Sequence, residues 1–405
     1  MIEKLHSYVD SIEDELIELR RLFHKNPELS GKEYGTARVL LKKLDDVGIE
    51  AKLLETEAGP GVVAVLGGKS RFPMIAFRAD MDALPLQDKK ICPYASTVPG
   101  VMHACGHDFN MTVITGLART LATIKDEIEG SVKFIFQPSE ESTEGGASYI
   151  IKAGAMEDVQ AIWTVHALPE LPTGKVGIRY GPITSATDAF KITIKGKSGH
   201  SARPHNSVDA IYVTTQILNS LYSYVYMKFD PRQPIVLSVG KISGGSAPNI
   251  ISGEVEFEGT VRVFDQQIRD KIPEIIRDLS TSIASSFGAE IEIDWHFGAP
   301  PVVNDEILAT ITEKCTENIL GKESVYLIKH PSMGAEDFSC YLWHAPGMLV
   351  RIGTGGENTS YPLHNSMFDI DEKAIGHGVK LLSSVALTYF AEQKMYPSRR
   401  PLSRR

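Results

Sequence analysis

The order in which apolar and amphipathic stretches follow one another constrains the fold of this 405-residue chain more than any other feature. Helical patterns at 1–30 and 33–48 come first. The apolar runs GVVAVLGG, FPMIAFR, SVKFIFQ and AIWTVHA then alternate with amphipathic stretches from about 111 and near 145–153. Such alternation is typical of an α/β domain with a largely buried sheet.

A different order of elements follows from about residue 184. Strand-like AFKITIKG leads to a helix at 207–226, strands IVLSVGKIS and EVEFEGTVRVF, a helix at 266–287, and strand EIEIDWHF. This β-α-β-β-α-β order is typical of ferredoxin-like folds, and Gly- and Pro-rich segments flank it on both sides. We therefore expect a discontinuous α/β catalytic domain at 1–183 plus 300–405, with a smaller domain inserted at 184–299.

The composition indicates a soluble protein that binds neither nucleic acid nor membranes. The net charge is −9, and the one basic run is the terminal SRRPLSRR. The N-terminus lacks the apolar region of a signal peptide, and no apolar run approaches the roughly 18 residues of a membrane span. The four cysteines lack CxxC spacing, so we expect reduced thiols in a cytoplasmic protein.

The stretch VMHACGHDFN contains Cys105 and His107 on either side of Gly106. Glycine lets the backbone turn, so both side chains could face one metal ion. Two other interpretations remain open at this point. The pair could lie in an ordinary loop, or Cys105 could be a nucleophile with His107 as its base.

Further candidates follow apolar strands or precede the last helix. Glu140 and Glu141 follow SVKFIFQ, His166 follows AIWTV, and His364 lies in the turn-like SYPLHN. Each has an ordinary explanation: a solvated turn, a core histidine or a surface histidine. Of the two adjacent glutamates, one could ligate a metal while the other stays unligated as a proton shuttle. Together with Cys105 and His107, the candidate ligands then supply one thiolate, three imidazoles and one carboxylate. That set suffices for two divalent ions if one ligand bridges them.

Motifs along almost the whole chain resemble those of the M20 family of metallopeptidases. They are RADMDALP, MHACGHD, QPSEE, GHSARPHNSVDA, APNIISGEVEFEGTVRVFD, GAEDFS and LHNSMFDIDE. The resemblance is to the amidohydrolase branch, which includes auxin-conjugate hydrolases, hippurate hydrolases and N-acetyldiaminopimelate deacetylases. It implies a dinuclear metallopeptidase catalytic domain with an inserted lid or dimerisation domain.

The resemblance also implies roles for the candidate residues. Cys105 would bridge two metal ions, His107 and His166 would complete one site, Glu141 and His364 the other, and Glu140 would be the general base. The wider family has a His-x-Asp motif where this chain reads Arg78-Ala79-Asp80, and His107 appears in place of the missing histidine. Asp80 would then orient a ligand imidazole.

Residues of the inserted domain complete the site that the resemblance implies. His200 would stabilise the negative oxygen of the tetrahedral intermediate, in its own subunit or across a homodimer. Asn249 and Arg262 would bind substrate, and Arg262 suits a carboxylate. His205 and His103 would have supporting roles.

These features predict a metal-dependent amidohydrolase that cleaves N-acyl-L-amino acids into an amino acid and a carboxylic acid. A water held between two cations would lose a proton to Glu140, which would pass it to the leaving amine. We expect Zn²⁺ or Mn²⁺, with Co²⁺ or Ni²⁺ as alternatives. The alternative hypotheses are a dipeptidase or carboxypeptidase of the same family, a catalytically silent binding protein, and a thiol-dependent hydrolase.

Overall fold

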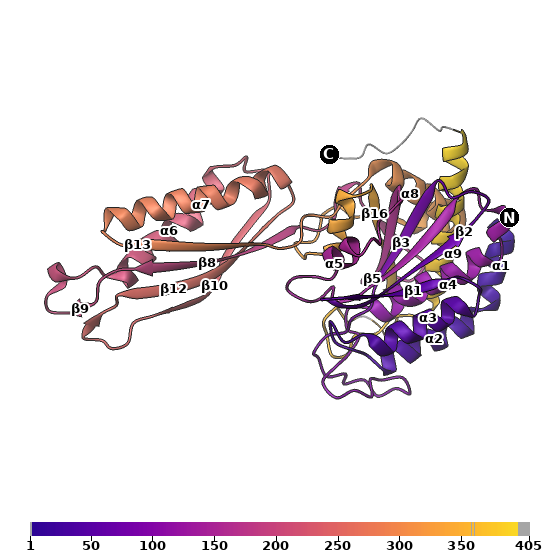
Figure 1. Cartoon of the computed structure of the whole chain (residues 1–405), viewed down its shortest axis with the longest axis horizontal. Coiled ribbons are helices and arrows are strands. Elements are labelled where there is room, and N and C mark those ends of the chain that lie inside the picture. Colours follow the sequence, from indigo (N-terminus) through magenta and orange to yellow (C-terminus); the bar gives the residue numbers. More distant parts are fainter. Residues whose placement is uncertain (1, 358, 360, 396–405) are drawn as a thin grey trace. The chain divides into compact units, whose positions relative to one another are not determined.

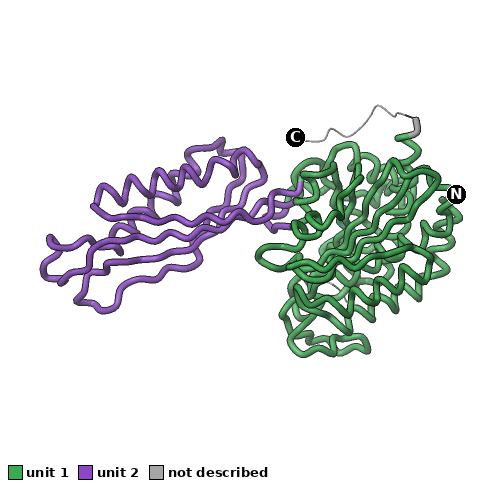
Figure 2. Tube along the Cα trace, viewed as in Figure 1, with its two compact units in different colours: residues 1–183, 303–331, 337–405 green, residues 184–302, 332–336 purple. Residues whose placement is uncertain are grey.

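The computed structural model describes residues 2–357, 359 and 361–395, and it divides the chain into two compact units (Figure 2). Unit 1 comprises Met1–Ile183, Val303–Pro331 and Asp337–Arg405, and unit 2 comprises Thr184–Val302 and Ser332–Glu336. The terminal basic run at 398–405 lies outside the described residues.

The short segment Ser332–Glu336 belongs to unit 2, although the sequence analysis assigned it to the catalytic domain. The main-chain N–H of Ser185 donates to the carbonyl oxygens of Ser332 and Gly334, at 3.1 and 3.0 Å. Hydrogen bonds between residues so far apart in the chain leave no local pattern, so the sequence does not predict that this segment joins unit 2.

Within its described residues, unit 1 contains an eight-stranded mixed sheet in the order β1-β2-β4-β3-β5-β16-β6-β15 (Figure 1). Its strands are β1 (Ala51–Thr56), β2 (Gly59–Gly67), β3 (Met74–Asp80), β4 (Ser131–Gln137), β5 (Ala161–Pro172), β6 (Val176–Ile178), β15 (Val325–Leu327) and β16 (Gly347–Gly355). The pairs β4-β3, β3-β5 and β5-β16 are parallel. Every residue of β3 and β4 is buried, which explains their continuous apolar runs.

The helices of unit 1 pack against this sheet or against one another, and those named next, except α5, contribute to one shared core. They are α1 (Ile2–Ser11), α2 (Glu13–Lys25), α3 (Tyr34–Asp45), α4 (His107–Ala122), α5 (Ala147–Lys152), α8 (Glu306–Leu320) and α9 (Lys373–Met395). The first helical pattern, expected as one helix, forms α1 and α2. Helix α4 begins four residues earlier than expected, at His107 itself.

Unit 2 has the strand and helix order expected from the sequence. Its main elements are β8 (Ala186–Lys195), α6 (Ala210–Met227), β10 (Ile235–Gly244), β12 (Glu254–Val263), α7 (Gln266–Ser286) and β13 (Glu290–Phe297). The four strands form an antiparallel sheet in the order β10-β12-β8-β13. Burial alternates along β8 and β12, so one face of this sheet packs into the core of unit 2.

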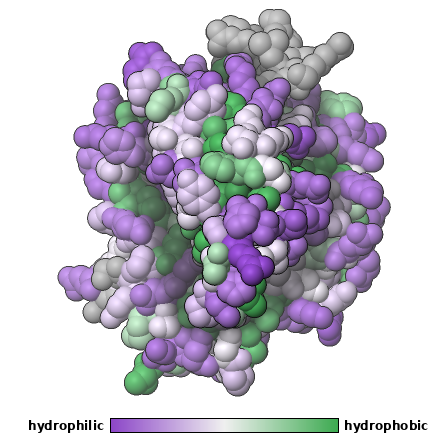
Figure 3. All heavy atoms as spheres, turned by 90° about the vertical axis from the view of Figure 1, so that its left-hand side faces the viewer, coloured by the Kyte–Doolittle hydropathy of each residue, from purple (hydrophilic) through white to green (hydrophobic). Residues whose placement is uncertain are grey.

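The structure confirms the predicted mixed α/β class. On the face shown in Figure 3, hydrophilic side chains predominate and smaller hydrophobic groups lie between them, a distribution that is ordinary for a protein surface. None of the helices in the described part of the chain is both long and apolar enough to cross a bilayer.

Candidate metal centre

Cys105 and His107 come together at the start of helix α4. Gly106 between them has a φ of 82°, in the left-handed region that favours glycine. A Cβ atom at Gly106 would lie 2.8 Å from the Cβ of Ala167, so a larger residue would not fit without displacing β5. The local backbone therefore requires glycine at this point between the two candidate ligands.

The first group of candidate ligands consists of Cys105, His107 and His166. Their ligand atoms all lie within 4.8 Å of one another, and the Cys105 Sγ is 3.5 Å from the His166 Nε2. His166 was expected at the end of a strand, but β5 continues to Pro172, so His166 lies within it. Its Nδ1 donates to the carbonyl oxygen of Ala167, which leaves Nε2 directed towards the thiol.

The second group consists of Cys105, Glu141 and His364. The His364 Nε2 lies 3.4 Å from the Cys105 Sγ and 3.2 Å from the Glu141 Oε1. The main-chain N–H of His364 donates to the carbonyl oxygen of Ala104, which holds this segment beside the thiol. Because Cys105 belongs to both groups, its sulfur is in a position to be shared by two ions.

His107 is oriented by the residue that follows β3 by two positions. Its Nδ1 donates to the carbonyl oxygen of Asp82 at 2.8 Å. Its Nε2 is buried and has no hydrogen-bond partner among the described residues. Carboxylate oxygens of Asp80, Glu140 and Glu141 lie 3.8, 3.9 and 4.0 Å from this nitrogen. Those distances are too long for hydrogen bonds, and they leave room for a cation among the four groups.

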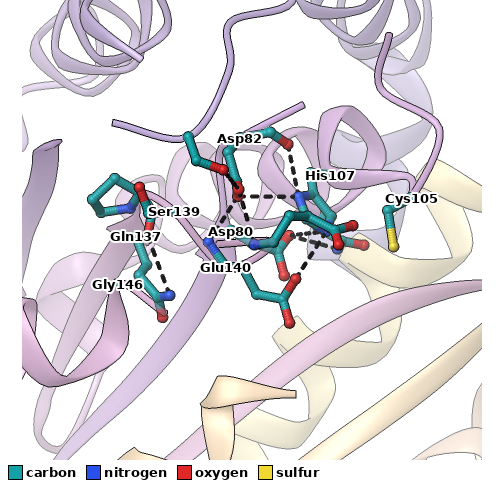
Figure 4. Close-up of polar contacts among 12 residues, drawn as sticks. Asp80, Asp82, Cys105, His107, Gln137, Ser139, Glu140 and Gly146 are labelled. Carbon is teal, nitrogen blue, oxygen red and sulfur yellow. Dashed lines mark hydrogen bonds and ion pairs between the residues drawn. The ribbon is translucent and has the colours of Figure 1, made fainter. Parts of the chain in front are cut away.

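The turn that carries Glu140 and Glu141 is held by the Asp82 carboxylate. The main-chain N–H groups of Glu140 and Glu141 donate to its two oxygens, each at 3.0 Å. The Ser30 hydroxyl donates to the same carboxylate at 2.7 Å. Figure 4 shows Asp80, Asp82 and Glu140 grouped around His107. Asp82 thus connects both candidate glutamates to the His107 ring.

Asp80 is fixed by buried donors. The Arg78 Nη1 and the Asn110 Nδ2 each donate to its carboxylate at 2.8 Å, and Arg78 also donates to Asp337. Burial alone would raise the pKa of Asp80, but the charges of His107 and Arg78 lower it to about 2. Asp80 is therefore an ionised carboxylate beside the His107 ring, although the hydrogen bond that orients that ring comes from Asp82.

The protonation states of Cys105 and His166 depend mainly on burial. Burial raises the pKa of the Cys105 thiol well above its usual range, although His107 opposes that rise. Burial and the charge of Arg351 keep the pKa of His166 well below its ordinary value. His166 is therefore neutral, the form that ligates metals, whereas Cys105 must lose a proton on metal binding.

A buried cluster of charged side chains also holds the start of α4. The Arg20 Nε and the His24 Nδ1 both lie 2.7 Å from Asp108, the residue directly after His107. Burial alone would raise the pKa of Asp108, but the charges of Arg20 and His24 outweigh it and lower the pKa well below its ordinary value. The cluster therefore fastens α2 to the helix that carries a candidate ligand.

The three candidate residues of unit 2 lie at two places in that unit. His200 in β9 (Gly199–His200) pairs with Ile250 in β11 (Ile250–Ile251), next to Asn249. Both His200 and Asn249 are exposed. Arg262 lies in β12, where its Nη1 donates to the carbonyl oxygen of Met333 at 2.8 Å. The structure thus groups His200 with Asn249.

The two histidines expected in supporting roles differ in exposure. His205 is exposed in a short 3-10 helix, Pro204–Asn206. His103 is buried, and neither of its ring nitrogens has a hydrogen-bond partner among the described residues. Burial lowers the pKa of His103 to about 4, so it is neutral at physiological pH.

The residues that hold the candidate ligands in place were not predicted from the sequence. Asp82, Asn110 and Asp337 all lie in or beside the motifs quoted above, and Asp82 follows Asp80 by two residues. A carboxylate two residues after a buried strand was the available signal for Asp82. Nothing in the local sequence indicated that Asp337 accepts from Arg78 and from the main chain of Gly146.

The side chains present fit divalent cations. Imidazole and thiolate suit Zn²⁺, Co²⁺ or Ni²⁺, and the neighbouring carboxylates suit Mn²⁺. The buried, unpartnered Nε2 of His107 and the sharing of Cys105 by two ligand groups both indicate a dinuclear site.

Comparisons with known proteins agree with this geometry. A sequence model of peptidase family M20/M25/M40 matches residues 76–388. The chain is 38% identical to the N-acetyl-L-cysteine deacetylase of Bacillus subtilis over 91% of this chain and 86% of that protein. It is 37% identical to thermostable carboxypeptidase 2 of Saccharolobus solfataricus over 96% of this chain and 99% of that protein.

A solved structure with the same fold is also similar in sequence. It is a Bacillus subtilis protein described as a dinuclear metal binding peptidase from the M20 family. The TM-score is 0.83 at 34% identity, over 94% of this chain and 99% of the other. The similarity therefore extends over both units.

Proposed function

The chain belongs to peptidase family M20/M25/M40, and from that premise we propose that this hydrolase cleaves the amide bond of N-acyl-L-amino acids. The products would be a free amino acid and a carboxylic acid, from N-acetyl, N-benzoyl or similar substrates. The observation that carries the proposal is Cys105 shared by two ligand groups, with Glu140 beside them. A relative named as an N-acetyl-L-cysteine deacetylase supports it.

In this proposal two divalent ions bind per subunit. Cys105 is the shared ligand, His107 and His166 complete one site, and Glu141 and His364 complete the other. Zn²⁺ or Mn²⁺ are the expected ions, with Co²⁺ or Ni²⁺ as alternatives. When bound, such ions polarise the amide carbonyl and lower the pKa of water.

The chain's own contribution to catalysis would come mainly from Glu140. As general base, Glu140 takes a proton from the attacking water and later delivers it to the leaving amine. Its carboxylate is 3.9 Å from the His107 Nε2, and its backbone is held by Asp82. Because its backbone is fixed, the Glu140 side chain projects from a defined position, which favours a reactive geometry.

We further propose that unit 1 is the catalytic domain and unit 2 a ferredoxin-like lid and dimerisation domain. The β-α-β-β-α-β order and the antiparallel sheet of unit 2 support this assignment. His200 would donate a hydrogen bond to the negative oxygen of the tetrahedral intermediate. Asn249 and Arg262 would bind substrate, and Arg262 would bind its carboxylate. A homodimer is the expected assembly.

A second candidate function is favoured by one comparison. The relative named thermostable carboxypeptidase 2 covers nearly the whole chain, so hydrolysis of a C-terminal peptide bond is the main alternative. Release assays with N-acetyl and N-benzoyl amino acids, beside peptides of matched C-terminal residue, distinguish the two. Metal-stripped protein with single ions restored also tests the remaining alternatives. A thiol-dependent hydrolase would keep its turnover without metal, and a silent binding protein would show no turnover with or without it.

The substitution Glu140→Gln tests the assigned base. It should retain both ions by elemental analysis and lower turnover by about 10²–10⁴-fold, because the amide cannot accept the proton. Glu144→Gln is the matched control, since Glu144 is exposed in the same loop and accepts from the Tyr149 hydroxyl. Near-normal turnover of Glu140→Gln with both ions bound would contradict the assignment.

A further inference from the structure

A buried carboxyl group outside the ligand set touches the turn that carries Glu140. Glu33 lies directly before α3 and is fully buried. Its Oε1 accepts a hydrogen bond from the main-chain N–H of Ser139 at 2.9 Å. The two residues are separated by 106 positions, so this contact joins the N-terminal segment to the end of β4.

Ser139 has an unusual backbone conformation. Its φ is 58°, in the left-handed region that residues other than glycine rarely adopt. Its hydroxyl donates to the carbonyl oxygen of Ala58 at 2.6 Å. Two hydrogen bonds, one to the buried Glu33 carboxyl group and one to the carbonyl oxygen of the half-buried Ala58, thus hold a conformation that the serine would otherwise leave.

The direction of the next two residues depends on that conformation. The N–H groups of Ser139, Glu140 and Glu141 are consecutive, and all three donate to buried carboxyl groups. Glu33 accepts the first, and Asp82 accepts the other two. The turn is therefore held at both ends, with the left-handed residue at the start.

The packing around Glu33 leaves space for its carboxyl group because position 59 is a glycine. Gly59 has a φ of 111°, and a Cβ atom there would lie 2.7 Å from the Cα of Gly31 and 3.0 Å from the Glu33 Oε2. A side chain at Gly59 would force Glu33 or the neighbouring backbone to move. Glycine at this position preserves the space for the carboxyl group.

We propose that Glu33 is a positioning residue: by holding the backbone of Ser139, it fixes the direction in which Glu140 and Glu141 project into the metal centre. The inference rests on the proposed function, because the roles of Glu140 and Glu141 are assigned there. Glu33 acts at a distance from the reacting atoms: it fixes the backbone from which the base and one ligand project.

The charge state of Glu33 suggests how to test the contact. Burial, and next the charge of Asp82, raise the pKa of Glu33 to about 8, so at neutral pH the carboxyl is mostly protonated. Glutamine has the same shape as a protonated glutamate and keeps an acceptor for Ser139. Aspartate keeps the carboxyl group but withdraws it by about 1.5 Å, one carbon–carbon bond.

The experiment compares Glu33→Gln, Glu33→Asp and the double variant Glu33→Asp/Ser139→Gly. Glu33→Gln should stay within about threefold of the wild-type kcat. Glu33→Asp should lower kcat by about 10–100-fold with KM within about twofold, and weaken binding of the second Zn²⁺ in calorimetric titration by about tenfold. Adding Ser139→Gly should recover most of both losses, because glycine adopts the left-handed conformation without help.

Glu28→Asp is the matched control. Glu28 lies in the same segment, and its carboxylate accepts from the main-chain N–H groups of Gly35 and Thr36 at the start of α3. It should leave kcat and Zn²⁺ binding unchanged. Equal effects of Glu28→Asp and Glu33→Asp would overturn the proposal, as would unchanged kcat and Zn²⁺ affinity in Glu33→Asp.

The Zn²⁺ titration also separates this inference from the proposed function. It needs no substrate, so an inactive wild-type protein would count against the N-acyl amino acid assignment alone. Wild-type-like Zn²⁺ binding by Glu33→Asp would count against the role of Glu33, whatever the substrate.

Discussion

Replacing Asp82 with asparagine should weaken both the fold of unit 1 and its affinity for divalent ions. The carboxylate accepts three hydrogen bonds, from the main-chain N–H groups of Glu140 and Glu141 and from the Ser30 hydroxyl. The substitution hardly changes the volume of this buried side chain. Any change in stability or in ion affinity therefore reports the loss of the negative charge and of one acceptor oxygen.

The size of the effect follows from these contacts. Asparagine keeps one acceptor oxygen. In its best orientation this oxygen still accepts from the Glu141 N–H and the Ser30 hydroxyl, and the NH₂ group then faces the N–H of Glu140. One bond to a charged acceptor is worth about 1.5–3 kcal/mol, and the bonds that remain weaken because the acceptor is neutral. We expect a loss of about 2–4 kcal/mol in the free energy of unfolding of the metal-free protein.

Two measurements check this expectation. Urea unfolding of the metal-free protein reports the loss of stability, and titration of Zn²⁺ against a competing chelator reports affinity, expected to fall by about 10–100-fold. Asp126→Asn, at an exposed aspartate of the same unit, is the control and should change neither. A loss below about 1 kcal/mol together with unchanged Zn²⁺ affinity would refute the role assigned to Asp82.

Two further predictions concern the start of α4. Cys105→Ala should bind fewer than two ions by elemental analysis, because both ligand groups use its sulfur; full retention of two ions would reject the shared ligand. The pKa of Asp108 lies below its unfolded value of about 3.9, so its ionised form stabilises the protein at neutral pH, and this contribution should decrease progressively as the pH falls below about 4. Urea midpoints of the metal-free protein between pH 6 and 3 should therefore fall less steeply in Asp108→Asn than in the wild type.

Much of the fold could be predicted because the signals are local. The apolar runs of β3 and β4 and the alternation along β12 reflect side chains that face a core, whichever strands lie beside them. The placement of His166 at a strand end was wrong for a non-local reason. Strand β5 continues to Pro172 because Pro172 still pairs with Gly355, far along the chain in β16.

By itself, the sequence determined which side chains could ligate metals or carry protons, since thiolate, imidazole and carboxylate chemistry belongs to residue types and their motifs. Tertiary structure decided which of them meet. Cys105 and His364 are 259 positions apart, yet the sulfur and the Nε2 lie 3.4 Å from each other. The support of the candidate site by Asp82 and Glu33 was equally hidden, because hydrogen bonds between distant backbone and buried carboxyl groups leave no periodic trace in the sequence.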